Sequence, residues 1–188
     1  AADLAGRMRS VAQVFRFVHK HEFEAVAHAL ELRPQVIETV NTLRRLGYKV
    51  GVVSEGCFIA AEIVRRRIFA DFALANTMLF EGSVCQGEAR LNRAYQRNGR
   101  DAGCNKHQYC SSNLLGHLRL GERDIALRHI LAVGSGANDR CLLRSADYAF
   151  VLDSCSEELL DEPGVTQLRS IAELVNCIAA INEDVATA

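Results

Sequence analysis

The chain of 188 residues is long enough to form one domain with a sizeable hydrophobic core. Hydrophobic residues make up 49% of it, charged residues make up 24%, and the formal net charge is −1. No global positive field therefore favours nucleic acid as a partner, no apolar run is long enough to span a bilayer, and the first residues contain no signal-peptide core.

Helix and strand patterns alternate along the first half of the chain. Apolar residues recur at three- and four-residue steps over 4–30, which predicts one long helix. A second helix is predicted between Pro34 and Gly47. The apolar run at 48–53 predicts a buried strand that ends in a turn at Ser54-Glu55-Gly56. Further patterns predict a helix at 59–68, a strand at 72–75 and a hairpin with its turn at Glu81-Gly82-Ser83.

The second half begins with a polar, arginine-rich stretch at 88–105, which predicts an exposed loop. Helices are then predicted at 107–120, 140–144 and 168–182, and strands at 130–133 and 148–152, the latter being the final strand. Because strands alternate with helices, we expect an α/β fold with a mostly parallel sheet covered on both faces.

Seven cysteines are scattered through the sequence without a disulfide-like spacing. They favour reduced, mostly buried thiols in the cytoplasm or the interior of an organelle, and not a secreted protein. Cys104, His107 and Cys110 form C-x2-H-x2-C, which offers three metal ligands. Because no fourth ligand follows at zinc-finger spacing, buried thiols are the preferred interpretation and no metal is expected.

The most informative stretch is ILAVGSGANDRCLL at 130–143, a strand followed by a glycine turn and polar residues. It occurs in order with LRPQVIETVNTLRRLGYKVGVVSEG, FALAN, FEGSVCQG and DYAFVLD over 32–153. Together these segments resemble the phosphoserine phosphatase branch of the haloacid dehalogenase (HAD) superfamily. The resemblance implies a HAD-like Rossmannoid three-layer sandwich for 34–188. It also implies that 1–33 is an N-terminal helical segment, either a reduced cap or a docking helix.

The resemblance assigns expected roles to a few residues. Ser54 matches the phosphate-holding serine, with the backbone at Gly56 beside it. The lysine that neutralises the phosphate corresponds to Lys106 or to Cys110, the residue that a gapless alignment places there. Gly134, Asn138 and Asp139 match the magnesium-binding motif G-D-x-x-x-D, but Ser135 stands where its first aspartate is expected.

Several departures from the family pattern predict that catalysis is lost. No D-x-D-x-T, the motif that carries the aspartate nucleophile, occurs in this sequence. Ser135 offers a neutral hydroxyl instead of a magnesium carboxylate, and a thiol at Cys110 cannot supply a positive charge. The segment at 24–33 is too short for the full helical cap of the family. We therefore expect no catalytic residues and no metal, and Ser54, Gly56, Lys106 and Asn138 become a vestigial phosphate site beside a vestigial Asp139.

The missing motif also removes a strand. In the family, this first strand lies between the strands matched here by 49–53 and 130–133. Without it, the backbone N–H and C=O groups on either side would be buried without partners, and each would destabilise the fold by about 1–3 kcal/mol. Three arrangements would satisfy these backbone groups: a preceding segment supplies the strand, a partner inserts one, or the flanking strands pair directly.

The preferred hypothesis is a phosphoserine phosphatase-like domain without catalysis and without a cofactor, acting as a structural or interaction subunit with protein partners. One alternative is an active magnesium-dependent phosphomonoester phosphatase whose nucleophile lies on a segment outside this sequence. Another is a non-catalytic module that binds phosphate or a phospho-amino acid through Ser54 and the backbone at Gly56. Neither nucleic acid nor a transmembrane segment is expected.

Overall fold

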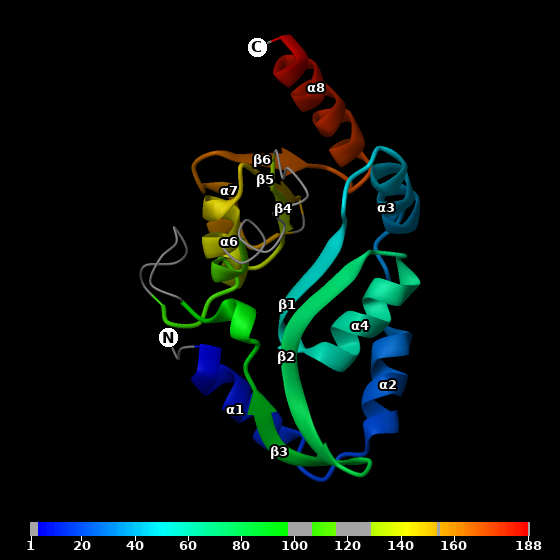
Figure 1. The fold of residues 1–188 in the computed structure, drawn as a ribbon, viewed down its shortest axis with the longest axis vertical. Helices are drawn as coiled ribbons and strands as arrows, with labels where there is room; N and C mark the ends of the chain where they lie inside the picture. Colours follow the sequence, from blue (N-terminus) through cyan, green and yellow to red (C-terminus); the bar gives the residue numbers. More distant parts are fainter. Residues whose placement is uncertain (1–3, 98–106, 116–128, 154, 188) are drawn as a thin grey trace.

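A computed structural model of the chain describes residues 4–97, 107–115, 129–153 and 155–187 (Figure 1). The strands are β1 (Gly51–Cys57), β2 (Phe72–Glu81), β3 (Val84–Arg90), β4 (Leu131–Gly134), β5 (Tyr148–Leu152) and β6 (Val165–Leu168). The helices are α1 (Leu4–Val14), α2 (Lys20–Ala29), α3 (Val36–Arg45), α4 (Phe58–Arg67), α6 (Arg140–Ser145), α7 (Glu157–Leu160) and α8 (Glu173–Thr187), with short 3-10 turns η1 (Arg93–Tyr95) and η2 (Ala137–Asp139). Within the described residues, no helix is both long and apolar enough to cross a membrane.

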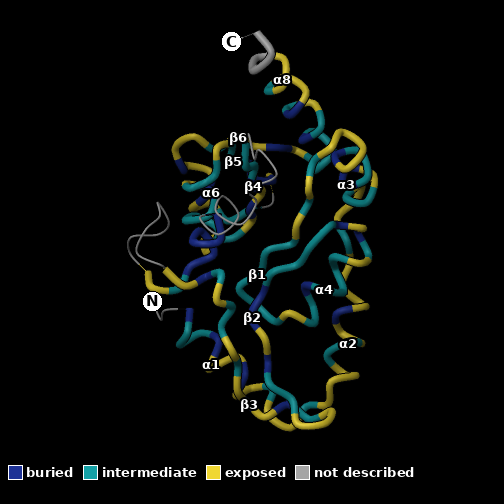
Figure 2. The backbone as a smooth tube through the Cα atoms, in the orientation of Figure 1, coloured by how far each residue is buried: buried dark blue, intermediate teal, exposed yellow. Residues whose placement is uncertain are grey.

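The sheet β4-β5-β6 is parallel and is covered on both faces. Side chains alternate along β5, so that Phe150 and Leu152 face α8 while Ala149 and Val151 belong to a second cluster with Leu143 of α6. Both sets are buried, which is typical of a central strand in a parallel sheet (Figure 2). The predicted covering of a parallel sheet by helices is confirmed here.

The sheet β1-β2-β3 joins a parallel pair to an antiparallel hairpin. The hairpin turns at Gly82, whose φ of +59° suits glycine, as the sequence predicted. Val52 of β1 packs with Val40 of α3 and Val64 of α4, whereas Val53 packs in a different cluster with Met8 of α1. This sheet is therefore also packed on both faces.

The predicted helix at 4–30 is wrong, because the chain forms α1 and α2 with a break between them. At the break Phe17 has a φ of +71° and its N–H donates to the Cys85 carbonyl at 2.9 Å. The N–H of Lys20 donates to the Ser83 carbonyl at 2.7 Å, so the break is held against the β2-β3 hairpin. These long-range hydrogen bonds override a local apolar pattern that is compatible with one helix.

Three other expectations need correction. β1 continues through residues 54–56, which were predicted as a turn beyond the strand. Of the stretch predicted as an exposed loop at 88–105, residues 88–97 complete β3 and then form η1, which ends in fully buried Tyr95, while residues 98–105 lie outside the described residues. The strand at 148–152 is not the last, because β6 follows it and pairs with it.

The two sheets are not hydrogen-bonded to each other within the described part of the chain. β1 pairs with β2 and β4 pairs with β5, so the flanking strands have not closed up and paired directly. Side chains join the halves instead, since Leu43 of α3 shares a core cluster with Phe150 and Leu174. Val133, in the middle of β4, is 37% exposed, which is unusual for a strand of a parallel sheet. We call the unpaired edges of β1 and β4 the open lane.

Candidate functional site

The first part of the candidate site is the carboxyl-terminal end of β1. Pairing with β2 is irregular between Val53 and Cys57, so the backbone of the intervening residues bulges out of the ladder. The N–H of Gly56 donates to Ser54 Oγ at 3.0 Å. The two residues predicted to hold phosphate thus bond to each other, and this hydrogen bond gives both a role within the bulge of β1.

Two buried side chains that the sequence did not single out hold this bulged segment in place. Tyr95 Oη lies 3.0 Å from the Ser54 carbonyl oxygen and 2.8 Å from that of Leu74, and its hydrogen is shared between them. Asn76 Nδ2 donates to the Glu55 carbonyl at 2.7 Å, while its Oδ1 accepts the N–H of Asn92 at 2.9 Å. Burial raises the pKa of Tyr95 well above its ordinary value, so the hydroxyl remains a donor.

Glu55 places a carboxylate directly after Ser54. Arg7 of α1 donates to Glu55 Oε2 at 2.6 Å, and the glutamate side chain is only 18% exposed. A carboxylate at this position would repel an anionic ligand at the predicted phosphate site unless a cation balanced it, and Arg7 is such a cation. The arrangement ties α1 to the end of β1.

The second part of the site is the turn after β4. Asp139 Oδ2 accepts the N–H groups of Ser135 at 2.8 Å and Gly136 at 3.0 Å, so the carboxylate closes its own turn. Gly134 is required beneath it, because a Cβ there would lie 2.8 Å from the Cβ of Asp139. Ser135 and Asn138 are exposed. Lys106, the fifth predicted site residue, lies outside the described residues.

This turn does not fit a magnesium ion. Magnesium prefers a near-octahedral shell of oxygen ligands, commonly one or two carboxylates with waters and phosphate oxygens. The turn has a single carboxylate, Asp139, whose Oδ2 already accepts two backbone N–H groups, and the hydroxyl of Ser135 is a poor substitute for a second carboxylate. We therefore derive no reaction step through a metal held by these residues.

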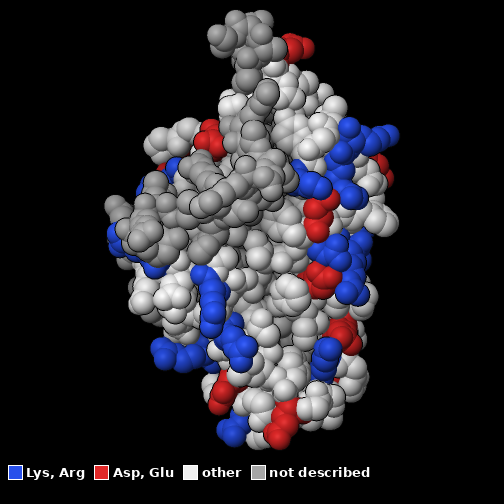
Figure 3. All heavy atoms as spheres, in the orientation of Figure 1, with Lys and Arg blue, Asp and Glu red and all other residues white. Residues whose placement is uncertain are grey.

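An arginine-lined hollow lies at the other end of the first sheet. It has a volume of about 310 Å³, and its lining includes Arg44, Arg65 and Asp71. Ion pairs engage its charges: Arg44 pairs with Asp71, and both Arg65 and Arg66 pair with Glu62, whose pKa falls to about 2 chiefly through the Arg65 hydrogen bond. Figure 3 shows basic and acidic side chains interspersed along the side of the molecule where α3 and α4 lie in Figure 1. The hollow adjoins the start of β2, so it is not part of the candidate site.

Comparison with known proteins agrees with this architecture. Over 121 residues the chain is 30% identical to phosphoserine phosphatase SerB2 of Mycobacterium tuberculosis, covering 64% of this chain and 26% of that protein. Over 123 residues it is 30% identical to the phosphoserine phosphatase of Haemophilus influenzae, covering 65% of this chain and 35% of that protein. The chain is phosphoserine phosphatase-like. No family model matches it.

Solved structures show the same fold for this phosphoserine phosphatase-like chain. A phospho-aspartyl intermediate analogue of phosphoserine phosphatase superimposes with a TM-score of 0.72 at 18% identity, covering 93% of this chain and 78% of that one. An apo phosphoserine phosphatase gives 0.71 at 20% identity, covering 89% and 78%. The predicted HAD-like α/β fold is confirmed. Because the chain spans only about a quarter to a third of the two curated relatives, their activity is not carried over to it.

Proposed function

We propose that this phosphoserine phosphatase-like domain does not hydrolyse phosphate esters by itself and acts as a structural or interaction subunit of a larger assembly. The observation that carries the proposal is the state of the turn after β4. Asp139 Oδ2 accepts the N–H groups of Ser135 and Gly136, and Ser135 offers no second carboxylate. Phosphoryl transfer depends on neutralising developing negative charge, and this turn supplies no cationic side chain and only one carboxylate to hold a metal ion.

The open lane supports the interaction role. β1 and β4 each pair along one edge only within the described residues, and unpaired backbone groups form a template for a further strand. The half-buried Val52 and Val53 and the exposed Val133 favour an apolar, extended segment. We propose that another polypeptide supplies this segment by β-strand addition.

A second candidate function rests on the same lane. The family resemblance implies that the strand at this place carries an aspartate nucleophile, so a strand with such a residue would restore one missing part of a phosphatase. Ser54 and Asn138 would then surround it at the strand ends. This candidate leaves Ser135 unexplained, and for that reason we rank it second.

A phosphatase assay tests the first proposal. Purified chain with magnesium and phosphoserine is expected to release phosphate at the rate of the buffer alone, and Ser54→Ala is expected to leave that rate unchanged. Turnover that depends on magnesium and disappears in Ser54→Ala would overturn the proposal. Asn182→Ala, on an exposed helix position away from β1, is the control variant. It should leave any measured rate unchanged, so that a loss seen only in Ser54→Ala is specific to the site.

Hydrogen exchange tests the open lane. In the isolated chain, the amides of β1 and β4 that do not bond to β2 or β5 are expected to exchange much faster than those of β5. The physical reason is that β5 has a paired neighbour on both sides. Protection of the β1 and β4 amides equal to that of β5 contradicts an open lane.

A further inference from the structure

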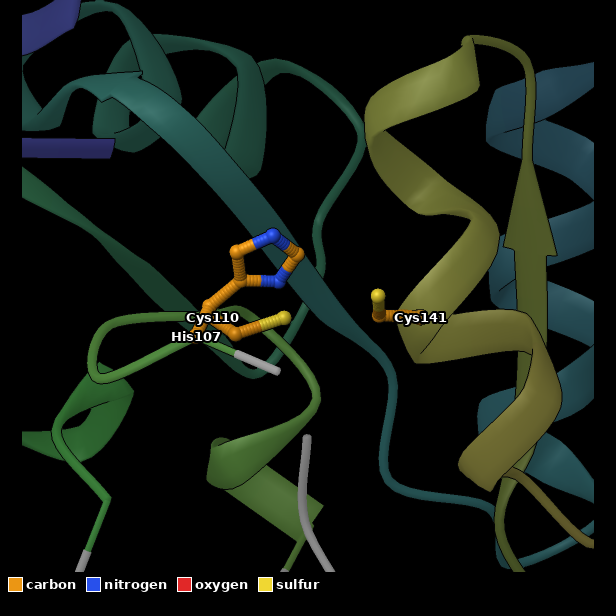
Figure 4. A group of neighbouring side chains, drawn as sticks. All are labelled: His107, Cys110 and Cys141. Atoms are coloured by element: carbon orange, nitrogen blue, oxygen red, sulfur yellow. The ribbon is translucent and has the colours of Figure 1, made fainter. Parts of the chain in front are cut away.

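A cluster of soft ligands lies between the two sheets. His107, Cys110 and Cys141 bring one ring nitrogen and two sulfur atoms within 4.8 Å of one another (Figure 4). Cys110 is 5% exposed, Cys141 is half-buried and His107 is exposed. Two of these residues belong to the C-x2-H-x2-C motif, but its Cys104 lies outside the described residues. Cys141, 31 positions after Cys110, is a ligand that sequence spacing did not reveal.

We propose that these three side chains bind one zinc-class metal ion. Two thiolates and an imidazole are a donor set that suits zinc, with Zn–S bonds of about 2.3 Å and Zn–N bonds of about 2.0–2.1 Å. Tetrahedral ligands at such distances stand roughly 3.3–3.8 Å apart. The observed separations of at most 4.8 Å therefore need an inward movement of about 1 Å or more at the widest pair, which side-chain rotation can supply. Soft ligands also select against magnesium.

The positions of the ligands give the ion a structural role. The Cys110 N–H donates to the Tyr95 carbonyl at 2.8 Å, which fixes His107 and Cys110 to the side of the first sheet. Cys141 lies on α6, whose Leu143 is buried against the second sheet. Figure 4 shows the cysteine of α6 facing His107 and Cys110 from the opposite side. A bound ion would cross-link two sheets between which the described residues form no strand pairing.

A neighbouring hydroxyl supports ligation by Cys110. Ser112 Oγ, fully buried, donates to Cys110 Sγ at 3.2 Å. Donation to the sulfur favours the thiolate, which is the form that binds a metal, and it also orients the ligand. The proposal stands whether or not the chain hydrolyses phosphate, since none of the three ligands is assigned a catalytic role.

Metal binding to the reduced, purified chain tests the proposal. We expect about one zinc ion per chain by elemental analysis, and a zinc-induced rise in the unfolding midpoint of the metal-free protein. Cobalt in place of zinc is expected to show thiolate charge-transfer absorption. Cys110→Ser and Cys141→Ser should each remove about half of that absorption and weaken zinc binding by at least about tenfold.

Cys177→Ser is the matched control, because Cys177 is also a half-buried free cysteine on a helix. It should keep the stoichiometry, the cobalt absorption and the zinc-induced shift. Unfolding of the metal-free proteins separates loss of a ligand from misfolding. Without zinc, Cys141→Ser should have the same unfolding midpoint as the parent, and only the zinc-induced rise of that midpoint should be lost. The proposal fails if the parent binds no zinc, if Cys141→Ser binds it as tightly as the parent, or if cobalt binds without thiolate absorption.

Discussion

Tyr95→Ala is expected to lower the free energy of unfolding by about 3–5 kcal/mol, because it removes a fully buried aromatic ring and leaves a cavity. Tyr95→Phe keeps the ring and removes only the hydroxyl that bonds to the Ser54 and Leu74 carbonyls. That variant should cost about 1–3 kcal/mol, since two buried acceptors lose their shared donor. Chemical denaturation followed by circular dichroism measures both values.

The matched control for the hydroxyl is Tyr48→Phe. Tyr48 Oη donates at 2.9 Å to Asn182 Oδ1 in an exposed pair, where water can replace the lost partner. Its cost should be within about 0.5 kcal/mol. If Tyr95→Phe is as harmless as Tyr48→Phe, then Tyr95 does not hold the end of β1, and the bulge around Ser54 must be maintained by other contacts.

Asn76→Asp is expected to destabilise the fold by about 2–4 kcal/mol at pH 7, with a smaller effect in acid. The new carboxylate would be fully buried and would face the Glu55 carbonyl in place of the amide donor. Burial raises the pKa of such a carboxyl above its unfolded value, so the folded state binds the extra proton. The deficit relative to the parent should therefore grow as pH rises from about 4 to 7.

Denaturation of parent and variant at several pH values between about 4 and 7 measures this difference and cancels the titration of groups that both share. Asn182→Asp is the control, because an exposed carboxylate can still accept from Tyr48. It should show a small effect with little pH dependence. A deficit for Asn76→Asp that does not depend on pH would contradict the expectation, because it would mean that burial does not raise the pKa of the new carboxyl in the folded state.

Residues with a local pattern were predictable from the sequence. α3 and α4 carry apolar stripes, Gly82 marks a tight turn, and the run at 130–133 precedes a glycine-rich turn, so each element is specified by neighbours along the chain. The break between α1 and α2 was not predictable in this way. It depends on backbone hydrogen bonds to residues 83 and 85, far along the sequence, which no local pattern contains.

The residues of the candidate site also fall into those that a local motif predicted and those that only the structure revealed. The sequence singled out Ser135, Asn138 and Asp139 from one contiguous motif and Ser54 from a separate motif at the end of an apolar run, because each motif can be recognised from neighbouring residues alone. It did not identify Tyr95, since an aromatic residue within a polar, arginine-rich stretch is typical of an exposed loop. The Asn92 side chain accepts the N–H of Ala94 at 2.9 Å and caps η1, and Tyr95 at the end of this turn lies in the core.

By itself, the sequence determined the fold class, the family resemblance and the absence of D-x-D-x-T and of the first motif aspartate, because all of these are properties of residue identity and order. Only the tertiary structure decided what the surviving polar groups do. It turned the Asp139 carboxylate onto its own turn, left β1 and β4 each paired along one edge only among the described residues, and brought Cys141 to His107 and Cys110. These outcomes depend on how two sheets pack against each other. Contacts between residues far apart in the sequence produce no local pattern from which they could be predicted.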